Sequence, residues 1–137
     1  MIQKVVSTGL LMRDDKVLVI QRSQREKFLP GYFELPGGKV DFGEDPAEAL
    51  AREFKEEVNL DVEVGNPYHT FSYISENGNR HTVEILYKVS LADTTTEPYI
   101  KLSEDHKDFK WIGLDQLEHL QLSDEIKSCI LRGFQSI

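Results

Sequence analysis

The sequence predicts an α/β protein of the α+β kind, in which a mixed β-sheet is flanked by helices. Stretches with strand-like apolar patterns outnumber those with helical spacing. Two stretches have helical spacing, 45–58 and 122–134, and the first of them lies between predicted strands. The 137 residues suit one domain, and no repeat or linker divides them. We therefore expect a single domain over residues 1–137.

The first strands are predicted from two apolar runs, 5–12 (VVSTGLLM) and 16–22 (KVLVIQR). Asp14 and Asp15 stand between these runs and suit a tight turn. Residues 25–40 contain proline and glycine at two places, which predicts a loop that includes at most one short strand.

A helix is predicted from the cap at Asp45 to about Val58. Asp45 suits the N-cap, Pro46 suits the first helical position, and Glu48 stands where a capping-box acid reaches back. Apolar residues recur every three or four positions and predict a buried stripe of Ala47, Leu50, Ala51, Phe54 and Val58.

The second half of the sheet is predicted as a hairpin of residues 61–74 and 81–91, joined around Asn77-Gly78. Leu86 lies on the otherwise polar face of the second strand, which indicates that both faces are covered. Residues 108–114 are predicted as the last strand. Residues 122–134 are predicted as a helix capped by Ser123, with a stripe of Ile126, Ile130 and Phe134.

Charge and cysteine content exclude several classes of protein. Sixteen basic against twenty-four acidic residues give a net charge of −8, which argues against duplex nucleic acid as a partner.

No apolar run reaches the ~20 residues that span a bilayer, and the N-terminal segment lacks a signal-peptide pattern. Cys129 is the only cysteine, and a packed hydrophobe is favoured there over a reactive thiol. We expect a cytoplasmic monomer or homodimer with a small-molecule ligand.

Three acidic residues of the first helix gather beside its apolar stripe. At ~100° per residue, Glu53, Glu56 and Glu57 share one sector, with Glu57 nearest the stripe. Like charges at this spacing repel one another, and Arg52 can relieve only part of the repulsion. The cluster is either a solvated acidic face or a site for a hard divalent cation, which takes oxygen ligands and shares them with phosphates. The glycine-rich loop upstream favours the cation.

Residues 38–60 closely resemble the Nudix box. The matching residues stand at the spacing of that motif and are Gly38, Glu44, Arg52, Glu53, Phe54, Glu56, Glu57 and Leu60. Asn59 stands where the motif has glycine, and asparagine is the next-best residue for a left-handed conformation. The flanks 17–23, 30–39 and 103–117 also look like those of a MutT-like Nudix domain.

The resemblance implies a Nudix-type α/β/α sandwich and a hydrolase that cleaves a phosphoanhydride in a nucleoside diphosphate derivative with Mg²⁺ or Mn²⁺. It implies metal ligation by Glu53, Glu56 and Glu57, and activation of water by Glu53 or Glu56. Arg52 would hold a carboxylate in place, although an ordinary surface pair is the alternative. Glu44 either joins the metal network or is a loop acid. Gly37 or Gly38 would offer a backbone carbonyl to the metal.

Substrate contacts are expected from residues outside the box, each with a plainer alternative. Arg22 and Arg25 would meet phosphates or are surface arginines. Phe33 and Leu35, together with Phe28 and Tyr73, would border a base or belong to the core. Glu104 stands with Asp105 and His106 in a loop that either assists the metal or is solvated. His69 and His81 are interpreted as structural.

The leading hypothesis is hydrolysis of a nucleoside triphosphate, with oxidised nucleotides included, to the monophosphate and pyrophosphate. An ADP-ribose or nucleotide-sugar pyrophosphatase is the alternative enzyme. A Nudix-fold sensor that binds without cleaving is the alternative from another class. All the box acids are present, which favours an enzyme over a sensor.

Overall fold

A computed structural model of the chain describes residues 1–136. Within that range the chain forms seven strands, two α-helices and one 3₁₀ helix. In chain order these are β1 (Ile2–Arg13), β2 (Lys16–Arg22), β3 (Phe33–Glu34), β4 (Gly37–Lys39), α1 (Pro46–Val58), β5 (Val62–Ser75), β6 (Arg80–Leu91), β7 (His106–Ile112), η1 (Leu114–His119) and α2 (Asp124–Gln135). None of the helices over residues 1–136 is long and apolar enough to cross a lipid bilayer.

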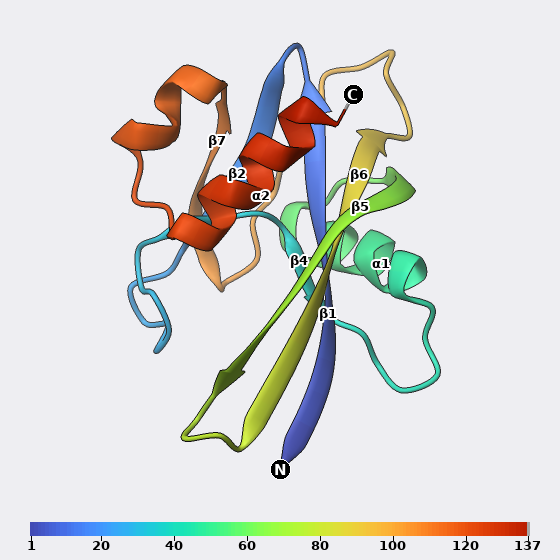
Figure 1. The fold of residues 1–137 in the computed structure, drawn as a ribbon. Coiled ribbons are helices and arrows are strands. Elements are labelled where there is room, and N and C mark those ends of the chain that lie inside the picture. The colour runs from blue at the N-terminus through green and yellow to red at the C-terminus, as the bar shows by residue number, and fades with distance from the viewer. Residues whose placement is uncertain (137) are drawn as a thin grey trace.

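The strand β1 is shared between two groups of strands. Residues 2–11 pair in parallel with β6, and Val6–Thr8 also pair antiparallel with β4. The end of β1, at Met12 and Arg13, pairs instead with β2, which carries β3 and β7. The β5–β6 hairpin and the start of β1 extend together away from the helices (Figure 1). The mixed sheet that the sequence predicts is therefore confirmed.

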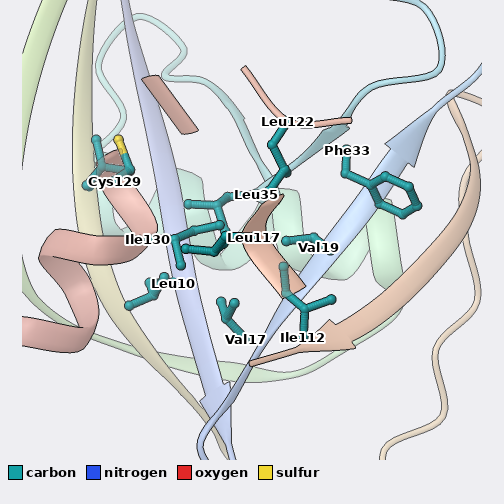
Figure 2. Packing of buried hydrophobic residues seen from close by; sticks show 11 residues of the cluster. Leu10, Val17, Val19, Phe33, Leu35, Ile112, Leu117, Leu122, Cys129 and Ile130 are labelled. Carbon is teal, nitrogen blue, oxygen red and sulfur yellow. The ribbon is translucent and has the colours of Figure 1, made fainter. Parts of the chain in front are cut away.

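Helices cover both faces of the sheet, with α2 in front of the strands and α1 behind them in the view of Figure 1. Successive residues of β1 alternate between the two cores: Leu10 packs in the cluster on the α2 side, and Leu11 packs in the cluster on the α1 side. Figure 2 shows the first cluster, where Ile130 lies close to Leu10 and Leu35. Leu86 belongs to this cluster, so its face of β6 is covered as expected. Each such side chain contributes about 1.5–3 kcal/mol on burial.

Both predicted helix caps are confirmed, whereas Glu48 makes no capping-box hydrogen bond in the described structure. The Asp45 carboxylate accepts a hydrogen bond from the Ala47 N–H at 2.9 Å, and Pro46 is the first helical residue. The Ser123 hydroxyl oxygen accepts one from the Ile126 N–H at 3.2 Å. These caps satisfy amide groups that the first turn of a helix leaves without intrahelical partners.

Some details of the predicted elements were wrong. Ala49 of α1 is fully buried, whereas Ala47 and Ala51 are only partly buried, because α1 packs against strands on a slightly rotated face. The last strand runs over His106–Ile112, and the next residues form the 3₁₀ helix η1, which the sequence did not predict. A 3₁₀ segment of this length has too few turns for an apolar period to be seen.

The end of α1 explains the residue that departs from the Nudix box. Asn59 adopts the left-handed conformation, with φ 62° and ψ 33°. Its N–H donates to the Lys55 carbonyl at 3.1 Å, and its side-chain amide donates to the Tyr99 carbonyl at 3.4 Å. Asparagine therefore ends the helix as glycine would, and the expected loop conformation is confirmed.

Two substitutions at this position test the role of the backbone conformation. Asn59→Gly should leave the free energy of unfolding nearly unchanged, because glycine adopts a positive φ without steric cost. Asn59→Ala should lower it by about 1 kcal/mol, because a Cβ disfavours this conformation. Urea unfolding followed by circular dichroism measures both. An alanine variant as stable as the glycine variant would contradict the prediction.

Candidate active site

The acidic residues lie where α1 meets β4, and two glycines allow this close approach. The Gly37 N–H donates to the Glu57 carboxylate at 2.9 Å. A Cβ on Gly38 would lie 2.6 Å from each Glu53 carboxylate oxygen, and a Cβ on Gly37 would collide with the Ser7 carbonyl of β1. A larger residue at Gly37 would force β4 and β1 apart, whereas one at Gly38 would displace the Glu53 carboxylate from its place.

Arg52 links three of the acids. Its Nε donates to Glu44 at 2.8 Å and its Nη2 donates to the other oxygen of Glu44 at 3.0 Å. Its Nη1 lies 3.1 Å from Glu53 and 3.2 Å from Glu56. These contacts, above all the one with Glu44, raise the pKa of the guanidinium. Arg52 thus offsets much of the repulsion that the sequence of α1 creates.

Glu44 is held as an ionised carboxylate at the start of the helix. Besides its two contacts with Arg52, it accepts a hydrogen bond from the Asp41 N–H at 3.0 Å. The Arg52 hydrogen bond and then the Asp41 amide lower its pKa to about 2. Glu44 therefore joins the 41–45 loop to α1 in this structure.

Glu57 is in the opposite electrostatic situation. Burial raises the pKa of its carboxyl to about 9, and the nearby acids Glu34, Glu53 and Asp105 add to the effect, while the Gly37 N–H opposes it. Burial also raises the pKa of Glu53, although Arg52 opposes that shift. Glu56 is exposed. At neutral pH the Glu57 carboxyl keeps its proton unless a cation comes close enough to favour the ionised form.

The donor chemistry of this junction fits a hard divalent cation. Carboxylate and backbone carbonyl oxygens are the ligands that Mg²⁺ and Mn²⁺ prefer. Glu57 is a crowded, buried acid whose recorded hydrogen-bond partner within residues 1–136 is an amide and not a cationic side chain. Over the same range no three His, Cys, Asp or Glu side chains already form a complete metal site. The guanidinium of Arg52 contacts both Glu53 and Glu56, and its positive charge partly neutralises these two carboxylates.

A cleft of about 890 Å³ opens beside Glu57 and Gly37. Its walls come from the start of β1, the β5–β6 hairpin, the loop 23–32 and the first turn of α2. The volume lies within the range of small-molecule sites. Aromatic residues border it on two sides, namely Phe28, Tyr32, Phe33, Phe71 and Tyr73.

The structure brings some of the expected substrate residues to this cleft and leaves others outside. Phe33 and Leu35 border it, while they also pack in the core with exposed fractions of 5% and 4%. Arg22 also borders it. Its guanidinium already contacts Glu34 at 3.1 Å and the Phe28 carbonyl at 2.7 Å.

Arg25 and Glu104 are exposed and do not border the cleft. The neighbour of Glu104 in the turn before β7, Asp105, does border it, as does His106 at the start of that strand. His69 stacks on Phe71 at 6.0 Å, and His81 pairs with Gln3 at 2.9 Å, outside the acidic cluster.

The sequence interpretation did not single out one central acid, Glu34. Its carboxylate lies 2.8 Å from the Nε2 of His106, a side chain with only 3% exposure, and it is close enough to Glu57 to raise the pKa of that residue. The available signal was an acid between two apolar residues, Phe33 and Leu35, in a short strand. Its partner is 72 residues away and no local pattern indicates it.

Comparisons with known proteins agree with this geometry. The sequence profile of the NUDIX domain matches residues 3–133. An ADP-ribose pyrophosphatase of Methanocaldococcus jannaschii is 29% identical over 121 residues, which are 88% of this chain and 68% of that protein. A nucleoside triphosphatase of Escherichia coli is 25% identical over 129 residues, which cover 88% of this chain and 89% of that protein. The crystal structure of a MutT Nudix hydrolase from Burkholderia pseudomallei has a TM-score of 0.79 at 24% identity, with 96% of this chain and 98% of that chain covered.

Arg52→Lys tests whether the planar guanidinium organises the acids. A lysine keeps the charge but cannot bind Glu44 through two parallel hydrogen bonds. The variant should melt a few degrees lower, and the pKa of Glu44 should rise from about 2 toward its ordinary value. Thermal unfolding and a carboxyl titration by nuclear magnetic resonance measure these effects. Arg132→Lys, on the exposed face of α2, is the matched control and should change neither.

The buried carboxyl of Glu57 predicts how stability depends on pH. Its pKa is about 9 in the folded protein against 4.5 for the ordinary group, so the folded state binds the proton more tightly. Without divalent cations, stability should therefore fall as pH rises from about 5 to 9, by at most about 1.4 kcal/mol per pH unit. Glu57→Gln should lack this part of the decline. Urea unfolding across that pH range in a chelator compares the two proteins, and parallel curves would contradict the prediction.

Proposed function

The chain belongs to the Nudix family and is a hydrolase of the pyrophosphatase type, and from that premise we propose that it hydrolyses nucleoside triphosphates, including oxidised ones, to the monophosphate and pyrophosphate. The observation that carries the proposal is the position of the acidic cluster. Glu57 and Gly37 border the same cleft as the aromatic residues Phe71 and Tyr73. A nucleotide in this cleft can place its base against the rings and its phosphates beside the acids.

The residues assigned to the metal are Glu53, Glu56 and Glu57, with a carbonyl from Gly37 or Gly38. A bound Mg²⁺ or Mn²⁺ supplies charge neutralisation at the phosphates and a more acidic attacking water. Glu53 or Glu56 would accept a proton from the attacking water. The Glu57 carboxyl, whose pKa burial raises, would hold the cation in its ionised form and would lose its proton when it does so.

The remaining box residues and the cleft position these groups. Arg52 orients Glu53 and Glu56, and Glu44 fixes the direction of Arg52 through two hydrogen bonds. Arg22 is the candidate for a phosphate contact, because it borders the cleft and Arg25 does not. Such a contact requires Arg22 to exchange its present partner Glu34 for the phosphate.

An ADP-ribose or nucleotide-sugar pyrophosphatase is the second candidate. It is supported by the relative from Methanocaldococcus jannaschii and by the cleft volume of about 890 Å³, which has room for a moiety beyond one nucleotide. A sensor without catalysis is less favoured, because every acid of the box is present and one of them, Glu57, borders the cleft.

A substrate panel with Mg²⁺ and with Mn²⁺ tests the proposal. Pyrophosphate released from triphosphates supports the leading candidate, whereas turnover of ADP-ribose or a nucleotide sugar alone supports the second. Absence of turnover with every triphosphate in both metals would overturn the leading candidate.

Glu57→Gln should reduce turnover at least a hundredfold, because it removes a ligand that acts on developing charge. Circular dichroism checks that the variant is folded. Glu118→Gln, at an exposed position of η1, is the matched control and should retain full activity. A chelator should abolish turnover of the native protein, and Mg²⁺ or Mn²⁺ should restore it.

A further inference from the structure

One side of the cleft carries polar residues that the acidic cluster does not explain. We name it the ribbon wall, and it consists of residues on one face of β1, β5 and β6: Lys4, Val6, Thr8, Phe71, Tyr73, Thr82 and Glu84. The strand register sets them in rows. Tyr73, Thr82 and Lys4 form one row, and Phe71, Glu84 and Val6 form the next.

Glu84 is a partly buried carboxyl on this wall whose partners are hydroxyl groups. The Thr8 hydroxyl donates to it at 3.1 Å. Burial raises the pKa of Glu84, while contacts with Thr8 and Tyr73 and the more distant charge of Lys4 oppose the shift. No arginine or lysine in the described range lies within ion-pair distance of it. A buried carboxyl gains stability from any further N–H donor that reaches it.

Two polar atoms on the same face of β6 as Glu84 lack hydrogen-bond partners in the described part of the chain. They are the Thr82 hydroxyl and the Arg80 Nε, in residues that both border the cleft, although the Arg80 Nη1 lies 3.5 Å from Glu76. Buried polar groups in proteins are usually paired, so an unpaired cluster calls for a ligand or ordered water. Its position in the cleft indicates a polar part of the substrate.

Beside these groups lies an apolar surface suited to a flat ring. The rings of Phe71 and Tyr73 stack with centroids 6.1 Å apart and planes 25° from parallel. Phe71 is the direct cross-strand neighbour of Glu84. Aromatic side chains of this kind stack on nucleobases, and polar groups next to them read the edge of the base.

We propose that Glu84 is a specificity-determining residue that selects bases with two adjacent N–H donors, as guanine has at N1 and its 2-amino group. A carboxylate only accepts hydrogen bonds, so both of its oxygens match such an edge. A base that presents carbonyl oxygens there faces repulsion from the carboxylate. This inference rests on the proposed function, since it names the base that the same cleft takes.

The test compares GTP with ITP, which differs only in lacking the 2-amino group, and with UTP. The native protein should have a KM for GTP about tenfold below that for ITP, because one hydrogen bond to a charged group is lost. Glu84→Gln should raise the KM for GTP about tenfold, with a smaller change in kcat, and should remove the preference for GTP over ITP. Glu63→Gln, an exposed acid on β5 outside the cleft, is the matched control.

Equal KM values for GTP and ITP in the native protein would overturn the inference, whether or not the Glu84 variant folds. An equal rise of KM for all three nucleotides in Glu84→Gln would overturn it as well, since a general loss of structure predicts that result. If no triphosphate is hydrolysed, calorimetry with GMP, IMP and UMP decides. If the native protein binds GMP more tightly than IMP and UMP, and the Glu84→Gln variant loses this preference, the inference is supported even though the proposed function has failed. Equal binding of the three nucleotides rejects the inference.

Discussion

The buried carboxyl of Glu57, joined to the Gly37 amide, is the contact on which the rest of this site depends. It places the last turn of α1 against β4, and β4 in turn against β1. That approach needs glycine at 37, where a side chain would collide with the Ser7 carbonyl, and a side chain at 38 would displace the Glu53 carboxylate. The same burial raises the pKa of Glu57, so the carboxyl would ionise most readily with a cation beside it. Packing and chemistry are therefore set by one interaction.

Arg52 divides the acids of α1 and of the loop before it into two electrostatic groups. Glu44 is strongly ionised by its two hydrogen bonds to the guanidinium, while Glu57 stays outside the reach of Arg52 and keeps its raised pKa. Glu53 lies between these extremes, since it is half-buried and contacts Arg52. A helix that carries several acids can thus remain folded without metal and still retain one carboxyl that binds a cation strongly.

The shared strand β1 gives the cleft two chemically different ends. Its pairing with β4 positions the acidic cluster, and its pairing with β6 builds the wall that carries Glu84. Between them Glu34 bonds to both Arg22 and the buried His106, which ties β2, β3 and β7 together at the floor of the cleft. A substrate that extends along the cleft therefore meets acids at one end and a polar, aromatic surface at the other.

Local signals in the amino-acid sequence account for several of the observed elements. These elements depend on contacts between residues that are close together in the sequence. They are the helix caps at Asp45 and Ser123, the left-handed Asn59 and the spacing of the acids along α1. Only the tertiary structure decided that Thr8 meets Glu84 and that His106 meets Glu34, 76 and 72 residues apart. The parallel pairing of β1 with β6 makes the first contact, and no period of two or 3.6 residues encodes which strands become neighbours. The raised pKa of Glu57 comes from burial and the lowered pKa of Glu44 from its hydrogen bonds with Arg52 and Asp41, and both depend on surroundings that folding assembles.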